Sequence, residues 1–144
     1  MIFTTKNTHR IIGSLVSIPM ITSPVGLIGL IGCVAPDWDI KLGRQFHRTF
    51  THSLLFLGFT TMFFNVINKE IGLIWFISYL SHLILDSCTE SGVMFLYPFK
   101  KKSYGLKLCY TGGVIDMLIE NIGYILLVIV VIYSMSNVIN FKSV

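Results

Sequence analysis

Residues 113–135 read GVIDMLIENIGYILLVIVVIYSM, and this stretch decides the class of fold. Its centre, Ile122–Tyr133, consists almost entirely of Ile, Leu and Val. A helix needs about 20 mostly apolar residues to cross the hydrocarbon core of a bilayer. The sequence therefore predicts a C-terminal transmembrane helix.

The composition of the whole chain agrees with a membrane environment. Of the 144 residues, 53% are hydrophobic and 12% are charged, which is about half the ~25% of charged residues usual in soluble domains. The mean hydropathy is +0.75. A soluble globular domain is close to excluded, and disorder is excluded because disordered segments have the opposite composition. The length suits one domain, residues 1–144.

The net charge of +4 arises from 11 Lys and Arg against 7 Asp and Glu. In a membrane protein such an excess collects in the cytoplasmic loops, so we expect no nucleic-acid partner. The cysteines, Cys33, Cys88 and Cys109, show no CxxC spacing and are odd in number. A disulfide framework is therefore not expected, and the cysteines fit a reducing compartment.

Three further apolar stretches precede the C-terminal one, and they are Ile11–Ala35, Ser53–Asn68 and Ile71–Ser87. The second and third are short and are joined by the polar residues Asn68, Lys69 and Glu70. This pattern predicts a helical hairpin.

The first stretch allows two interpretations. It could be one kinked span of 25 residues, or two half-helices that turn back between Pro19 and Pro24. Each half would reach only about 17–20 Å, short of a ~30 Å bilayer core. The polar residues described below favour the second interpretation. The predicted fold is an all-α integral membrane protein with an N-terminal re-entrant helical pair, a transmembrane helical hairpin and a C-terminal transmembrane helix.

Most of the histidines and acidic residues lie at or beside the ends of the apolar stretches. Ionisable groups within a membrane are costly and mark functional sites. Imidazole and carboxylate groups together are the ligands that zinc or a similar divalent ion requires. The residues placed in this way are His9, His47, His52, His82, Asp37, Asp39, Asp86, Asp116 and Glu120.

Two pairs of these residues have metal-ligand spacing. His82 and Asp86 are four apart, so they share one helix face and could bind one ion. A buried hydrogen bond from His82 to Asp86 explains the same spacing equally well. Asp37 and Asp39 follow Pro36 and would project to one side of an extended backbone. Paired carboxylates can hold metal ions, although a solvated loop also accounts for this pair.

His47 and His52 are five residues apart, which places them about 140° apart on a continuous helix. They converge only if a helix begins between them, and Thr51 is the predicted N-cap of that helix. Arg48 suits an anionic ligand because its planar fork pairs with two phosphate oxygens. Its alternative role is that of a loop arginine that sets membrane orientation.

Asp116 and Glu120 are four apart at the start of the last helix, on one face. The helix macrodipole favours an acidic residue in the first turn, which is the simpler explanation for Asp116. Glu120 lies one turn deeper and has no such explanation.

These groups can form one site only if they meet on one side of the membrane. His52 and His82 meet in a hairpin, and His9 meets Asp37 if Ile11–Ala35 turns back. In that arrangement nine of the eleven Lys and Arg residues lie on the side of the site, all except Lys69 and Lys142. By the positive-inside rule, the site then faces the cytoplasm of a multi-pass protein in the cell (inner or plasma) membrane.

Three ordered motifs resemble those of the YdjM-type inner-membrane proteins, which are described as LexA-regulated, membrane-bound, metal-dependent hydrolases. The family pattern is Pro-Asp-x-Asp, then His-Arg-Gly-x-Thr-His-Ser, then His-x-x-x-Asp with a Gly and a Pro downstream. The matching residues are Pro36-Asp37-Trp38-Asp39, His47-Arg48-Thr49-Phe50-Thr51-His52-Ser53, Ser81-His82-Leu83-Ile84-Leu85-Asp86, Gly92 and Pro98.

The chain departs from the family pattern in two places. Thr49 replaces the usual glycine, and Asp116 stands where a glutamate is expected, with Glu120 as a possible substitute. The family is in turn distantly similar in motif order to the zinc-dependent phospholipase C and single-strand nuclease enzymes, which cleave phosphoesters.

The residues and the resemblance together imply a membrane-bound hydrolase that uses one to three divalent ions, zinc first. The metal would lower the pKa of a bound water toward ~7 and polarise the scissile group. One carboxylate among Asp37, Asp39 and Glu120 would act as general base, and Arg48 would stabilise negative charge. The expected ligands are His9, Asp37, Asp39, His47, His52, His82, Asp86 and Asp116.

A lipid or lipid-linked phosphoester is the expected substrate, because the site would lie at the depth of the headgroups. Two alternatives belong to other classes of protein. One is a small metal or proton transporter with an intramembrane relay, and the other is a non-catalytic interaction protein with a structural metal. The sequence leaves the oligomeric state open.

Overall fold

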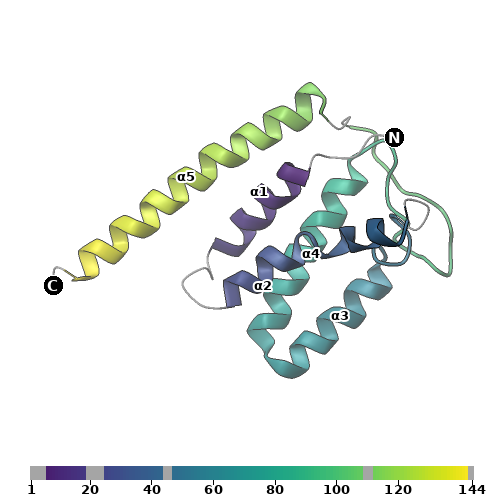
Figure 1. The fold of residues 1–144 in the computed structure, drawn as a ribbon, viewed down its shortest axis with the longest axis horizontal. Helices are drawn as coiled ribbons and strands as arrows, with labels where there is room; N and C mark the ends of the chain where they lie inside the picture. Colours follow the sequence, from purple (N-terminus) through teal and green to yellow (C-terminus); the bar gives the residue numbers. More distant parts are fainter. Residues whose placement is uncertain (1–5, 19–24, 44–46, 109–111, 143–144) are drawn as a thin grey trace.

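The computed structural model describes residues 6–18, 25–43, 47–108 and 112–142, and every regular element in these ranges is a helix (Figure 1). An isolated antiparallel bridge joins Val93 to Tyr104 in the long loop. The predicted all-α class is thus confirmed. The helices are α1 (Lys6–Ser17), α2 (Val25–Gly32), the 3-10 helix η2 (Ala35–Leu42), α3 (Leu54–Ile67), α4 (Lys69–Ser87) and α5 (Val114–Lys142).

The first apolar stretch contains two short helices, α1 and α2, which pack against each other and against α4. Glycines permit this close packing. A Cβ atom at Gly29 would lie 2.2 Å from Oγ of Ser17, and a Cβ atom at Gly13 would lie 2.1 Å from Cβ of Cys33. Two half-helices side by side are what the re-entrant interpretation predicts, and the turn at residues 19–24 lies outside the described residues.

Helices α3 and α4 form the predicted hairpin, and Asn68 alone joins them. The Asn68 backbone N–H closes the last turn of α3 on the Phe64 carbonyl oxygen. Its side-chain oxygen accepts a hydrogen bond of 2.7 Å from the Glu70 backbone N–H, which caps the start of α4. The predicted connection also included Lys69 and Glu70, but both belong to the first turn of α4.

The start of α3 corrects one prediction. Ser53 is the N-cap residue, and its hydroxyl oxygen accepts a hydrogen bond of 3.2 Å from the Phe56 backbone N–H. The prediction that Thr51 caps this helix is therefore wrong. The hydroxyl of Thr51 instead donates to Asp39, so its hydrogen bond is used in the functional site.

A small aromatic and aliphatic core joins the hairpin to the long loop, and it consists of Leu57, Trp75, Tyr79, Leu83 and Val93. Two hydrogen bonds connect α4 to neighbouring segments. The Trp75 indole N–H donates to the Thr60 hydroxyl of α3 at 3.0 Å. The Tyr79 hydroxyl donates to the Thr51 carbonyl oxygen at 2.5 Å. Residues three and four apart share a helix face, so the face that buries Tyr79 also buries His82, Leu83 and Asp86.

Helix α5 runs beside α1 in the same direction (Figure 1). Thr8 contacts Asp116 near the start of both helices, and a Cβ atom at Gly123 would lie 2.5 Å from Ile11 one to two turns later. Residues Val114–Tyr133 have a mean hydropathy of 2.3, and only 11% of this apolar segment is buried inside the protein. Among the described helices, this one is long and apolar enough to cross a membrane.

Neither helix of the hairpin is both long and apolar enough to cross a membrane. Helix α4 has 19 residues but is too polar for a span, and helix α3 is too short. Helix α3 has 14 residues, which span about 21 Å at 1.5 Å per residue, short of a ~30 Å hydrocarbon core. The structure therefore supports one membrane span by length and composition.

Candidate metal centre

The predicted ligands converge because α1 and α3 begin, and α2 and α4 end, at the same end of the helices (Figure 1). His9 lies in the first turns of α1, His52 lies two residues before the start of α3, and His82 and Asp86 lie in the last turns of α4. The 3-10 helix η2 follows α2 at this end and carries both Asp37 and Asp39. Segments distant in sequence thus supply one cluster.

Within the described residues, seven side chains form three overlapping groups, and in each group the ligand atoms lie within 4.8 Å of one another. His82 belongs to two groups and His52 to two, so the groups form one continuous centre. The groups are His9 with His82 and Asp86, Asp37 with His52 and His82, and Asp39 with His47 and His52. All seven residues were predicted as ligands from the sequence.

The spacing at the middle of the centre fits a cation. Oδ2 of Asp86 lies 3.3 Å from Nε2 of His52 and 3.6 Å from Nε2 of His82. Oδ1 of Asp37 lies 3.5 Å from the same atom of His82. A charge-assisted N–H···O bond would be about 2.7–2.9 Å long, whereas two ligands bound at ~2.0–2.1 Å to a tetrahedral ion stand about 3.4 Å apart.

The hydrogen-bonding state of the two central histidines agrees with this geometry. Within the part of the chain that the structure describes, Nε2 of His52 and Nε2 of His82 are buried and have no hydrogen-bond partner. Nδ1 of His82 lies 2.7 Å from the carbonyl oxygen of Cys33. Because a carbonyl oxygen can only accept, Nδ1 carries a proton, and Nε2 is the nitrogen that faces the carboxylates and could bind a metal ion. Metal-binding histidines commonly have this second contact.

Asp39 holds the other side of the centre. Its Oδ1 lies 2.8 Å from Nδ1 of His47, and its Oδ2 accepts a hydrogen bond of 2.6 Å from the Thr51 hydroxyl. Burial acts to raise the pKa of Asp39, but the hydrogen bonds from His47, His52 and Thr51 outweigh it and hold the pKa below its usual range. Asp39 therefore stays a carboxylate at neutral pH.

Asp37 marks the open side of the centre, since its side chain is 22% exposed while that of Asp86 is 2% exposed. Burial acts to raise the pKa of Asp37, and the nearby imidazoles of His82 and His9 lower it further than burial raises it. The centre is therefore open to its surroundings at Asp37.

Arg48 contacts the protein with both of its terminal nitrogens. Nη2 donates to Oδ1 of Asp86 at 2.7 Å, and Nη1 donates to the Thr89 hydroxyl at 2.7 Å and to the Gly92 carbonyl oxygen at 3.2 Å. Arg48 has a φ of 63°, a left-handed backbone that is uncommon for residues other than glycine. This geometry gives Arg48 a role in positioning Asp86, while the predicted contact of Arg48 with phosphate stays a prediction.

The loop that receives Arg48 depends on a glycine. Gly92 has a φ of 64°, and a Cβ atom there would lie 2.5 Å from the Tyr104 carbonyl oxygen. A larger residue would therefore displace the strand-like pairing of Val93 with Tyr104, whose backbone groups exchange two hydrogen bonds of 2.9 Å. The glycine of the third motif thus has a structural reason.

Asp116 and Glu120 belong to none of the three groups found among the described residues. Oδ1 of Asp116 accepts a hydrogen bond of 2.7 Å from the Thr8 hydroxyl, and Oδ2 accepts one of 2.9 Å from the Gly112 backbone N–H. Glu120 accepts a long hydrogen bond of 3.4 Å from Asn7. Both acids therefore join α5 to the first turn of α1, next to His9.

Sequence reasoning missed three groups that hold the ligands in place: the Thr51 hydroxyl, the Thr89 hydroxyl and the Cys33 carbonyl oxygen. Thr51 could have been identified from its place inside the His47–Ser53 motif. A backbone carbonyl carries no side-chain signal, and Thr89 is distinguished only by following Asp86 at a spacing of three.

Comparison with known proteins places the chain in a family. It is similar to the uncharacterized protein YvsG of Bacillus subtilis (strain 168), with 38% identity over a match that covers 49% of this chain and 54% of that protein. The chain thus spans about half the length of this curated relative. No solved structure matches the chain. The family model of the YdjM inner membrane protein matches residues 3–144, a range that includes all seven converging ligands, and the chain therefore belongs to the YdjM inner membrane protein family.

Proposed function

We propose that the protein is a metal-dependent hydrolase of the inner membrane that cleaves a phosphoester of a lipid or lipid-linked substrate. The observation that carries this proposal is the buried row of imidazole nitrogens and carboxylate oxygens around Asp86 and His82. Their separations of 3.3–3.6 Å match ligands of a shared cation better than hydrogen-bonded pairs.

The donor set favours zinc or a similar borderline divalent ion. Each of the three groups mixes imidazole nitrogen with carboxylate oxygen, and zinc hydrolases use such mixed sets. The three groups allow at most three ions, and because His52 and His82 are each shared between two groups, the number can be as low as one. When bound, such an ion supplies a Lewis acid and lowers the pKa of coordinated water toward ~7.

Three groups of the protein would act together with the bound ion, one as general base and two by positioning ligands. Asp37, the most accessible acidic ligand of the centre, is the general-base candidate closest to an incoming substrate. Arg48 holds Asp86 through a hydrogen bond of 2.7 Å, so the carboxylate keeps its orientation when the substrate binds. The Cys33 carbonyl oxygen fixes the tautomer of His82.

The position of the centre supports a hydrolase over a transporter. A transporter requires ligands that are reached from both faces of the membrane, whereas these seven side chains gather at one end of the helices. The partial exposure of Asp37 supports catalysis over a purely structural ion, because structural sites are closed.

We place the centre at the cytoplasmic face of a multi-pass protein. The support is the distribution of basic residues, nine of which fall on the side of the centre in the re-entrant arrangement. The parallel course of α1 and α5 agrees with this arrangement, because the start of α5 then lies beside the centre.

The test combines metal analysis with a substrate screen. The protein is purified in detergent, its metal content is measured by plasma mass spectrometry, and phosphate or alcohol release is measured from a panel of phospholipids and polyprenyl phosphates. We expect bound zinc and turnover that is abolished by a chelator and restored by zinc. A metal-free protein with no turnover after zinc is added would overturn the proposal.

A further inference from the structure

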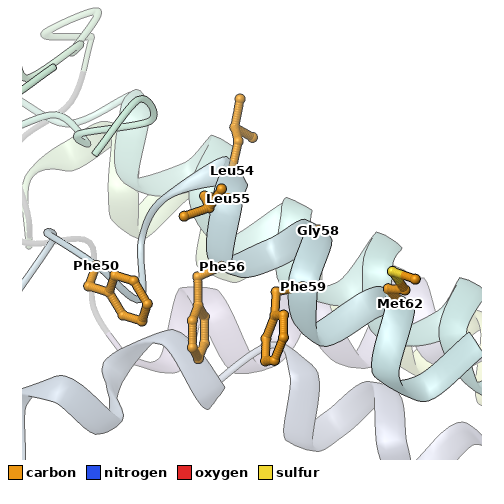
Figure 2. Close-up of a pocket in the computed structure, with 7 residues that line it drawn as sticks. All are labelled: Phe50, Leu54, Leu55, Phe56, Gly58, Phe59 and Met62. Atoms are coloured by element: carbon orange, nitrogen blue, oxygen red, sulfur yellow. The ribbon is translucent and has the colours of Figure 1, made fainter. Parts of the chain in front are cut away.

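An open apolar groove of about 690 Å³ runs along α3 (Figure 2). The rings of Phe50, which precedes the helix, and of Phe56 and Phe59 point to the same side of the ribbon in Figure 2. The volume is in the range of ~300–1,000 Å³ typical of small-molecule sites. The groove is lined by Phe50, Leu54, Leu55, Phe56, Gly58, Phe59 and Met62, none of which carries a polar side chain.

The groove ends next to the candidate metal centre. Phe50 lies at one end of the groove and is followed in the sequence by Thr51 and His52. The Thr51 hydroxyl donates a hydrogen bond to Asp39, and His52 belongs to two of the ligand groups. The Phe50 ring contacts the Phe56 ring, with centroids 5.1 Å apart. An occupant of the groove would thus have one end near the centre.

Gly58 lines the groove without a side chain. It lies between Leu54 and Met62 on α3, at the helical spacing of four residues, and a Cβ atom there would meet no atom within 4 Å. Helix propensity disfavours glycine by ~1 kcal/mol relative to alanine, and no packing contact within the structure compensates for it. A large side chain introduced at this position would therefore project into the open groove.

The lining side chains are strongly exposed in the structure, with Phe59 at 71%, Met62 at 70% and Leu55 at 47%. The opposite face of α3 packs on α4 through Leu57, which is 2% exposed. The exposed face is therefore not needed for the core, and in an inner membrane protein its natural occupant is hydrocarbon.

We infer that this groove binds a hydrocarbon chain of the substrate lipid, extended along α3 with its headgroup end at Phe50 and the metal centre. The inference rests on the proposed function and specifies its substrate: the lipid carries a linear chain of which the segment next to the headgroup is held by the protein. A bulk annular lipid would instead lie over α3 without a fixed register.

The test uses photo-crosslinking, which needs no turnover. The whole protein in nanodiscs receives trace phosphatidylglycerol that carries a diazirine at the middle of one acyl chain, and the labelled peptides are mapped by mass spectrometry. We expect labels concentrated at Phe59 and Met62. Gly58→Trp, whose indole would occupy part of the groove, should lower them about tenfold, the effect of displacing roughly two buried methylenes.

A matched control lies on the same helix. Val66 is 81% exposed and does not line the groove, so Val66→Trp should leave the labels at Phe59 and Met62 unchanged. Even labelling of α3 and α5 that Gly58→Trp does not alter would overturn the groove. Metal content and chelator-sensitive turnover are measured on the same samples, so failure of the groove and failure of the metal hydrolase are separate results.

Discussion

Arg48 donates a hydrogen bond of 2.7 Å to Oδ1 of Asp86, while Oδ2 of Asp86 faces His52 and His82. One carboxylate thus connects a fixed guanidinium to the imidazoles of the centre. Removing one partner of a buried ion pair leaves the other charge uncompensated, which costs ~3–5 kcal/mol. The Arg48–Asp86 pair therefore stabilises the loop that carries Arg48 and also fixes the position of Asp86 relative to His52 and His82.

We predict that Arg48→Lys lowers metal affinity as well as turnover. A lysine has one nitrogen, so it cannot reach Asp86, Thr89 and Gly92 with the geometry of the planar fork. The expected loss is about 10–100-fold in metal affinity, typical of groups that orient ligands. Zinc titration with a competing chelator measures it.

The alternative role of Arg48, contact with a phosphoryl group, gives a different result. In that case Arg48→Lys keeps its metal and loses about 10²–10³ in turnover, the effect of removing one preorganised donor. Comparing zinc affinity with turnover on the same preparation separates the two roles. Full activity together with full affinity would exclude both.

We predict that His82→Ala and Asp86→Asn each remove bound metal while membrane insertion is kept. These residues join ligand groups of the centre, whereas insertion depends on the apolar helix Val114–Tyr133. Metal analysis and size-exclusion chromatography in detergent check both halves. Unchanged metal content in both variants would reduce the pair to a structural hydrogen bond.

Asp116→Asn serves as the matched comparison for these variants. Its carboxylate accepts hydrogen bonds from Thr8 and Gly112 and is in none of the three groups. We therefore expect Asp116→Asn to keep its metal and to loosen the contact of α5 with α1, seen as a lower Tm. Loss of metal in this variant would extend the centre to α5, as the family resemblance suggests.

We predict that Gly92→Ala destabilises the protein more than Gly112→Ala. Both glycines have a left-handed backbone, with φ of 64° and 69°, and each alanine pays about 1–2 kcal/mol for that conformation. Only at Gly92 would the new Cβ also collide with the Tyr104 carbonyl oxygen, since Gly112 has open space. Thermal unfolding in detergent gives the order of the two Tm values, and equal values would remove the steric explanation.

We predict that the two ends of the chain lie on opposite faces of the membrane, with the N-terminus in the cytoplasm. The motivation is a re-entrant α1–α2 pair, one hairpin and one final span. Single cysteines introduced at Lys6 and Lys142, in a background without native cysteines, are labelled with a membrane-impermeant maleimide in spheroplasts. Labelling of both ends from the same side would mean that residues 11–35 cross fully.

Much of the fold could be predicted from the apolar pattern, because apolar residues are favoured away from water, either in the protein core or in the membrane. The hairpin, the last helix and the division of the first stretch into two short helices were predictable in this way. Seven ligands were predictable because imidazole and carboxylate groups are rare in such stretches. Helix boundaries were less predictable: Thr51 and Ser53 are both good N-cap residues, and tertiary contact with Asp39 decided between them.

The roles of Arg48 and Asp116 could not be derived from the sequence for a related reason. A guanidinium and a carboxylate can bind a ligand or a protein group with the same chemistry, and only the fold brings Arg48 to Asp86 and Asp116 to Thr8. Membrane orientation likewise depends on the whole distribution of loop charge, which no single motif contains.

The join at Asn68 has a consequence for how the chain tolerates insertions and deletions. Because Asn68 closes α3 and caps α4 with no spare residue, a residue added between Asn68 and His82 cannot be absorbed by a loop. Each added residue turns the rest of α4 by 100° and advances it 1.5 Å, which would carry the imidazole of His82 away from Asp37. Insertions and deletions in the exposed loop around Lys101 should therefore be tolerated. Insertions and deletions between Asn68 and His82 in α4 should abolish metal binding.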